Sequence, residues 1–206
     1  MAVTPSVAAR SREASLCRYD AGLAPGADEP EARRARLRAA LRSAEWREAV
    51  GAVQTVGKAR QRWAVPILIE RFENEERQDI YAGIKGNWPF AKMKTTFYGW
   101  ADPAFPEADK RRFRLKAVLL EALGRLGAHE AAGLVIRTLE RGADFYPALV
   151  QACLAAARLE LTEALPVLDR YAVYPEVNAQ RASILAARRI RGEISGTEFE
   201  DQIGGF

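Results

Sequence analysis

A two-helix pattern recurs along this chain, and the recurrence constrains the fold more than any other feature of the sequence. The second helix of each copy begins with alanine and carries apolar residues opposite a charged outer face. Its copies read "AVPILIERF" (64–72), "AAGLVIRTL" (131–139) and "ALPVLDRYA" (164–172). The first helix ends in a related signature, which reads "AVQTVG" (52–57), "EALGRLG" (121–127), "AAARLEL" (155–161) and, truncated, "LAARRIRG" (185–192). Such a pair cannot bury its apolar stripe alone, so the pattern predicts neighbouring pairs stacked into one continuous core.

The spacing of the copies locates an interruption in the pattern. Leu126 and Leu159 are 33 residues apart, and Leu159 and Ile190 are 31 residues apart. From Val56 to Leu126 the separation is 70 residues, about two such periods. The longer interval predicts either an extra unit or a long insertion after the first copy. We place the insertion at about 76–105.

The stretch "LGRLG" (123–127) followed by "AAGLVIRTL" resembles the bacterial HEAT-like repeats, whose consensus is close to "ALGxLGxxxAxPxLxxxL". The resemblance covers residues 45–74 and 113–191. It implies an all-α, right-handed helical-repeat solenoid, which in a chain of this length holds about four helical pairs. The sequence departs from the family pattern in three ways: "KARQRW" (58–63) lengthens the first turn, the turn lacks the family's aspartate, and Gly133 stands where a proline is usual.

The functions that this resemblance implies belong to three classes: adaptor and assembly scaffolds, phycobilin lyases and alkylpurine DNA glycosylases. The glycosylases place a catalytic aspartate among aromatic and arginine side chains in a concave groove. That constellation does not map residue by residue onto this sequence, and no residue supports a lyase. The resemblance therefore carries over a fold and no activity.

Helical periodicity and capping signals divide the chain into segments. Alanine, leucine, arginine and glutamate dominate the composition and β-branched residues are sparse, which favours helices. Residues 1–29 are expected to form an irregular N-terminal arm and 30–192 the repeat domain. The tail, 193–206, contains Thr197 and Glu200 at capping-box spacing. We expect helices at 31–44, 45–58, 64–74, 106–126, 130–141, 145–159, 163–172 and 175–191, three of them ended by Gly127, Gly142 and Gly192.

The net charge of +4 permits an anionic partner without requiring one. In a HEAT-like array the second helices line the concave face, and their exposed positions here mix both signs: Glu70, Arg71, Glu73, Arg137, Glu140, Arg141, Asp169 and Arg170. Positive charge concentrates on the first helices, at Arg33, Arg34, Arg36, Arg38, Arg42, Lys110, Arg111, Arg112, Arg114, Lys116, Arg181, Arg188, Arg189 and Arg191. Carboxylates are interspersed among them, so solvated outer faces are the favoured interpretation and an anion-binding surface the second one. The one-sign basic track that a nucleic-acid groove needs is missing.

Catalytic and metal-binding motifs are absent from the sequence. Cys17 and Cys153 are far apart and are interpreted as two free thiols, with Cys153 in a helix interior. His129, the only histidine, falls in a turn between helices, where a solvated position is expected. Asp79 and Asp102 flank an aromatic segment and are interpreted as turn-forming or solvated residues. The sequence therefore predicts no enzyme activity, no metal and no cofactor.

The segment "KGNWPFAKMKTTFYGW" (85–100) has no helical period, although helical patterning surrounds it. It holds five aromatic side chains and three lysines without a carboxylate. In one interpretation its aromatic side chains cover the seam between repeats, because so apolar an insertion must bury much of its surface. A protein interface is the second interpretation, and stacking on a single-stranded nucleic acid is the third. The candidate partner-binding residues are Tyr81, Lys85, Trp88, Phe90, Lys92, Lys94, Phe97, Tyr98 and Trp100.

These observations together predict a non-catalytic protein–protein interaction scaffold, adaptor or assembly subunit, whose partner is a protein with an acidic surface. The alternative is a nucleic-acid-binding protein of the HEAT-like DNA glycosylase type. No apolar run reaches the ~18 residues that span a bilayer. The N-terminus also lacks the apolar h-region of a secretory signal. We therefore expect a soluble, cytoplasmic protein without a membrane span.

Overall fold

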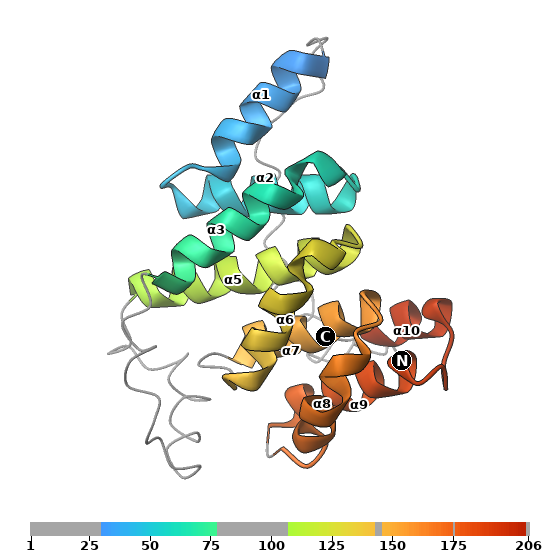
Figure 1. Ribbon diagram of the computed structural model, residues 1–206. Helices are drawn as coiled ribbons and strands as arrows, with labels where there is room; N and C mark the ends of the chain where they lie inside the picture. Colours follow the sequence, from blue (N-terminus) through green and yellow to red (C-terminus); the bar gives the residue numbers. More distant parts are fainter. Residues whose placement is uncertain (1–29, 78–106, 143–145, 175, 205–206) are drawn as a thin grey trace, which may run out of the picture.

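The computed structural model describes residues 30–77, 107–142, 146–174 and 176–204, and all regular secondary structure in these ranges is helical (Figure 1). The prediction of an all-α fold is confirmed. The first range holds α1 (Pro30–Leu41), α2 (Trp46–Lys58), the 3-10 turn η2 (Arg62–Ala64) and α3 (Val65–Arg77). The second holds α5 (Glu107–Arg125), η6 (His129–Ala131) and α6 (Ala132–Glu140). The remaining elements are α7 (Tyr146–Arg158), η7 (Thr162–Ala164), α8 (Leu165–Tyr171), α9 (Val177–Ile190) and α10 (Gly196–Ile203).

Helices α2, α5, α7 and α9 pack one against the next in chain order, and we call them the helix row (Figure 1). Each intervening helix packs against the next member of the row, α3 on α5, α6 on α7 and α8 on α9. α1 packs on α2 and α3 at one end, and α10 packs on α9 at the other. Because α2 and α5 are in direct contact, no extra helical pair separates them in the row. The predicted insertion lies outside the described residues, except that its first two residues belong to α3.

The turns that end the four row helices share one hydrogen-bond pattern. The backbone is left-handed at Arg60, Gly127, Glu160 and Gly192, where φ is +49°, +59°, +51° and +75°. The N–H of the following residue donates to the carbonyl five residues before it, at 2.9–3.1 Å, in the pairs Gln61 to Val56, Ala128 to Leu123, Leu161 to Ala156 and Glu193 to Arg188. This is the Schellman arrangement, which ends a helix and satisfies its last carbonyls. Successive turns are 67, 33 and 32 residues apart.

These turns also correct the register of the copies. Ala59, and not Val56, corresponds to Leu126, so the first interval is 67 residues rather than 70. Three residues separate the row helix from the 3-10 turn in each of the first three copies. The expectation that "KARQRW" lengthens the first turn is therefore wrong. The correspondence of the turns is hard to see in the sequence, because two copies have Arg60 and Glu160 at the left-handed position. The other two copies have glycine there, Gly127 and Gly192.

Close packing within the row depends on small residues at corresponding positions. A Cβ added to Gly57 would lie 3.1 Å from the Cβ of Ala122, and one added to Gly124 would lie 3.0 Å from the Cα of Ala155. Gly57 corresponds to Gly124, and Ala122 corresponds to Ala155, so one close approach recurs in two successive helix contacts. Cys153 of α7 is fully buried in the same core, as its helical context predicts.

Several predicted helix boundaries differ from those observed; α3, for example, continues to Arg77 instead of ending at residue 74. α1 ends at Leu41 rather than at residue 44, which leaves a short turn before α2. α10 is capped by Ser195 and Glu198, not by Thr197 and Glu200. The Glu198 N–H donates to the Ser195 hydroxyl at 3.1 Å, and the Ser195 N–H donates to the Glu198 carboxylate at 2.7 Å. The two pairs have the same spacing, and capping at Ser195 accompanies full burial of Phe199 against the rest of the core.

Candidate anion-binding pocket

The nine candidate partner-binding residues between Tyr81 and Trp100 lie outside the described residues. Their role therefore stays a prediction. The structure does describe the helices on both sides of them, since α3 ends at Arg77 and α5 begins at Glu107. These two helices, together with the turn between α1 and α2, enclose a pocket.

This pocket has a volume of about 480 Å³, and we call it the arginine pocket. Its lining residues are Arg42, Ala44, Glu45, Trp46, Arg71, Asn74, Glu75, Arg111, Arg112 and Leu115. The lining thus holds four guanidinium groups and two carboxylates, and a third carboxylate, that of Glu70, pairs with Arg42 from outside the lining. Ligand sites in proteins have volumes of roughly 300–1,000 Å³, so the pocket is large enough for a small molecule or for a side chain of another protein.

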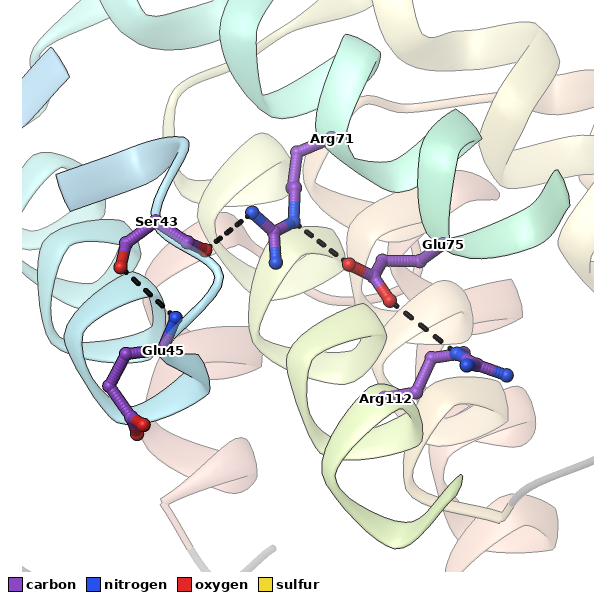
Figure 2. A network of polar contacts seen from close by, with 5 residues as sticks. All are labelled: Ser43, Glu45, Arg71, Glu75 and Arg112. Carbon is purple, nitrogen blue, oxygen red and sulfur yellow. Dashed lines mark hydrogen bonds and ion pairs between the residues drawn. The ribbon is translucent and has the colours of Figure 1, made fainter. Parts of the chain in front are cut away.

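Glu75 organises the floor of the arginine pocket (Figure 2). Arg71 donates from Nε to Glu75 Oε1 at 2.9 Å, and Arg112 Nε lies 3.6 Å from Glu75 Oε2. These side chains are largely buried, with exposed fractions of 17% for Arg71, 20% for Arg112 and 10% for Glu75. One carboxylate therefore orients two guanidinium groups, each contributed by a different helix.

Arg71 also connects the floor to the turn between α1 and α2. Its Nη1 donates to the carbonyl oxygen of Ser43 at 2.8 Å (Figure 2). The Ser43 hydroxyl in turn accepts from the Glu45 N–H at 3.1 Å, and the Glu45 carboxylate accepts from the Arg47 N–H at 3.1 Å as the N-cap of α2. The turn is thereby fixed relative to α3, and the pocket keeps its shape.

Trp46 forms one wall of the arginine pocket. The guanidinium carbons of Arg47 and Arg111 lie 5.6 and 5.9 Å from its ring centroid, which are cation–π contacts. Arg42 is the most exposed of the lining arginines for which an ion pair is described, with 57% of its side chain exposed and Nη2 3.4 Å from Glu70 Oε2. The floor residues are therefore largely buried and ion-paired, while Arg42 is more exposed.

The described lining of the arginine pocket is rich in hydrogen-bond donors, which suit it to binding. Guanidinium groups remain protonated in proteins and donate hydrogen bonds without exchanging their charge. Among the described lining residues there is no serine, cysteine, histidine or lysine. Its clustered guanidinium donors favour an anionic group.

His129 and Cys153 are not among the described residues that line the pocket. His129 is exposed in η6, as the sequence predicted. Cys153 is fully buried in α7, where burial raises the pKa of the thiol, so it packs as a small apolar residue. Among the described residues, no three histidine, cysteine, aspartate or glutamate side chains lie close enough together to hold a metal ion.

The sequence did not reveal the arginine pocket as a site. Arg42, Arg111 and Arg112 were assigned to solvated outer faces, and Arg71 to a surface of mixed charge. These residues come from three separate parts of the chain, so no local sequence motif indicates that they lie close together. One usable signal was Trp46 directly after an arginine-rich helix, because a tryptophan near clustered arginines favours stacking contacts.

Within the described ranges, no helix combines the length and the apolar character that crossing a bilayer requires. Comparison of the chain with protein-family models, with curated proteins and with solved structures gives no match.

Proposed function

We propose that the chain is a HEAT-like, right-handed helical-repeat solenoid. Two recurrences support this architecture. The four row helices end in the same turn at corresponding positions, and the glycine–alanine approach of α2 to α5 recurs between α5 and α7. A stack of similar pairs, each in contact mainly with its neighbours, produces such recurrences.

The function that fits this architecture and its site is that of a non-catalytic cytoplasmic scaffold, adaptor or assembly subunit. It binds a partner protein through acidic groups on the partner's surface. The observation that carries this proposal is the arginine pocket, in which Arg71 and Arg112 are held by one buried carboxylate. Donors that are already oriented lose little conformational entropy on binding, which favours a partner that presents an anion.

The aromatic segment is proposed as a further part of the same interface. Its candidate residues follow Arg77 and precede Glu107 in the sequence, and Glu75 and Arg111 line the pocket within a few residues of those two points. Tryptophan and tyrosine are enriched among the residues that dominate protein–protein binding energy. The aromatic segment is joined along the chain to α3 and α5, which both line the arginine pocket. This connection supports a joint role of the segment and the pocket in binding.

Nucleic-acid binding, including a HEAT-like DNA glycosylase activity, is the alternative. The described ion pairs favour a protein partner instead. Arg141 pairs with Glu76 at 2.9 Å, and Arg191 pairs with Asp169 at 2.7 Å, each across two helices. A surface with carboxylates beside its arginines repels a phosphate backbone locally, whereas a protein partner can match both signs.

Charge reversal in the pocket tests the proposed function. We expect Arg42→Glu combined with Arg111→Glu to weaken binding of the native partner by at least about tenfold, because two attractive charges become repulsive. The partner is first identified by affinity purification with the full chain, and its dissociation constant is then measured for each variant. Trp88→Ala combined with Trp100→Ala is expected to weaken binding as well, with helicity and melting temperature nearly unchanged.

The matched control is Arg137→Glu combined with Arg170→Glu, two exposed arginines of α6 and α8 outside the pocket. This control should bind the partner with unchanged affinity. If the pocket variant and the aromatic variant both bind as the unmodified chain does, the proposed interface is wrong. Salt-dependent binding to DNA or RNA in place of a protein partner would favour the alternative.

A further inference from the structure

We propose that Arg34 and Arg38, which lie over the ring of Trp63, form a second contact site for the partner, and we call these two arginines the stacked pair. The group that they receive is a short acidic segment of the partner protein, with two carboxylates about one helical turn apart. This inference concerns a surface outside the arginine pocket. It rests on the proposed function, because one protein partner would occupy both sites.

The ring of Trp63 orders the stacked pair. The guanidinium carbons of Arg34 and Arg38 lie 5.1 and 5.4 Å from the ring centroid, within the range of cation–π contacts. The ring is partly buried, and its Nε1 donates to Gln61 Oε1 at 2.9 Å, which holds its orientation. Arg34 and Arg38 are four residues apart in α1, so they lie on one face of this helix.

The stacked pair differs from the arginines of the pocket in having no acidic partner among the described residues. Arg42, Arg71 and Arg112 are ion-paired. No hydrogen bond or ion pair within the described ranges involves the guanidinium group of Arg34 or Arg38. Of the Arg34 nitrogens, only Nε is buried without an acceptor, so its two terminal nitrogens are accessible to solvent. Arg38 is exposed. The donors of the stacked pair are therefore available to a partner.

The spacing of the stacked pair matches two carboxylates on one side of a peptide segment. A guanidinium group that lies over an aromatic ring still donates through its edge, and a carboxylate accepts two parallel hydrogen bonds from it. Side chains four residues apart on a helix have Cβ atoms about 5–6 Å apart. A segment with carboxylates one turn apart can therefore pair with Arg34 and Arg38 at once.

The carboxylates that flank the stacked pair favour such a short segment over a nucleic-acid backbone. Glu31 lies three residues before Arg34 in α1. Glu70 pairs with Arg42, four residues after Arg38. A phosphate backbone that continued along α1 would meet both carboxylates and be repelled, whereas two carboxylates of a protein segment occupy only the interval between them.

The stacked pair is close enough to the arginine pocket for one partner to use both. Arg42 follows the last residue of α1 and lines the pocket. Because a helix rises 1.5 Å per residue, Arg38 lies roughly 6 Å from Arg42 along the axis of α1. A partner with an anionic group in the pocket would therefore bring its neighbouring residues to the stacked pair.

Fluorescence anisotropy with the full chain tests this inference at low salt. The probes are labelled, capped hexaglutamate and a labelled oligothymidylate of equal charge. We expect hexaglutamate to bind more tightly than the oligothymidylate. Arg34→Gln combined with Arg38→Gln should lower the affinity for hexaglutamate about tenfold or more, because two charge-assisted contacts are lost. The control, Arg137→Gln combined with Arg170→Gln, removes the same charge from α6 and α8 and should keep the affinity within about twofold.

Substitution of Trp63 separates ordered donors from charge alone. Trp63→Leu leaves every charge in place and removes the aromatic face, so it should lower the affinity for hexaglutamate severalfold. Trp63→Phe keeps the face and should retain most of the affinity. Melting temperatures show whether each variant is folded. If the glutamine double variant unfolds, Arg34→Lys combined with Arg38→Lys replaces it, because lysine keeps the charge and loses the planar fork, and a severalfold loss is then expected.

The outcomes distinguish this inference from the proposed function. Absence of hexaglutamate binding, or equal binding by the Arg34 and Arg38 double variant, overturns the inference. Equal binding by Trp63→Leu overturns the ordering role of the ring. Tighter binding of the oligothymidylate overturns the acidic segment in favour of a nucleic acid. The proposed function is decided separately, since it fails only if the native partner binds the charge-reversed pocket and the aromatic variant as it binds the unmodified chain.

Discussion

The two ends of the helix row use arginine in different ways. At the end formed by α9 and α10, guanidinium groups pair with carboxylates. Arg158 donates from Nε and Nη2 to the two carboxylate oxygens of Glu200, at 2.8 and 3.1 Å. Arg191 donates to Asp169 at 2.7 Å. The positive charge of these arginines is compensated within the end itself.

At the other end, formed by α1 and α2, arginines lie over indole rings. The guanidinium carbons of Arg34 and Arg38 are 5.1 and 5.4 Å from the ring centroid of Trp63, and Trp46 has the two similar contacts described above. An aromatic face attracts a cation through its quadrupole and carries no net charge of its own. These contacts therefore order the arginines without adding a negative charge.

This difference explains where a site for an anion can arise. Ion pairs at the α9–α10 end balance the charge of the arginines there. One of them, between Arg158 and Glu200, connects the last helix to α7. Cation–π contacts at the α1–α2 end keep positive charge at the surface and hold it in place, and the arginine pocket lies at this end. The candidate site thus lies at the end where stacked arginines stand beside the ion-paired arginines of the pocket.

The largest expected effect tests the structural role of the paired end. Phe199 of α10 is 1% exposed and belongs to the core. We expect Phe199→Ala to lower the free energy of unfolding by about 3–5 kcal/mol, because it removes a fully buried aromatic ring and leaves a cavity. Urea denaturation followed by circular dichroism measures the change. Gln202→Ala, at an exposed position of the same helix, is the control; a loss below about 1 kcal/mol for Phe199→Ala would mean that α10 is not part of the core.

A smaller effect is expected from the ion pair that accompanies this helix. Glu200→Gln should cost about 1–2 kcal/mol at pH 7, because Arg158 is 8% exposed and loses its charged acceptor while Glu200 is itself half exposed. Glu193→Gln is the matched control, since Glu193 lies 3.7 Å from Arg188 and both side chains are well exposed. This control should change stability by less than about 0.5 kcal/mol.

The same pair predicts a pH dependence. The hydrogen bonds from Arg158, assisted by the charges of Arg125 and Arg60, lower the pKa of Glu200 below its ordinary value of 4.5, although burial opposes them. The folded state therefore favours the carboxylate more than the unfolded state does. The resulting stability is complete above pH 4.5 and is lost as the pH falls through the lower pKa of the folded state. The stability difference between the unmodified chain and Glu200→Gln should shrink over this range, and a constant difference would contradict the assignment.

The sequence predicted those parts of the fold that depend on local signals. Apolar periodicity located the helices, and Gly127, Gly142 and Gly192 located three helix ends, because only a residue without Cβ adopts positive φ at no steric cost. The corresponding turns at Arg60 and Glu160 contain no glycine, so the true register between copies was visible only in the hydrogen bonds.

Local sequence signals of this kind could not predict the candidate site. Arg42 comes from the turn after α1, Arg71 from α3 and Arg112 from α5, and each of them individually has the character of a surface residue. Glu75 brings two of them together from one position in α3, a role that no spacing rule identifies. The partner-binding prediction for 81–100 concerns residues outside the described ranges and stays a prediction.

The smallest expected effect tests the stacked end. Trp63 is partly buried, and its Nε1 donates to Gln61 Oε1 at 2.9 Å. Trp63→Phe removes this hydrogen bond and keeps an aromatic face under Arg34 and Arg38, whereas Trp63→Leu removes the face as well. We expect the leucine variant to be less stable than the phenylalanine variant by about 0.5–1 kcal/mol, which is the size of a cation–π contact at a partly exposed site. Urea denaturation of both variants measures this difference.

The stability effects of substitutions at the two ends should also depend differently on salt concentration. A cation–π contact acts at short range, so the difference between Trp63→Phe and Trp63→Leu should persist when the salt concentration rises from about 0.1 to 1 M. The cost of Asp169→Asn, which breaks the exposed pair with Arg191, should shrink over the same range, because salt screens charges that are in contact with water. If instead the phenylalanine and leucine variants are equally stable at both salt concentrations, the ring of Trp63 serves only as apolar cover. Stacking would then give no reason to expect ordered positive charge at the α1–α2 end, and the contrast between the two ends would rest on their ion pairs alone.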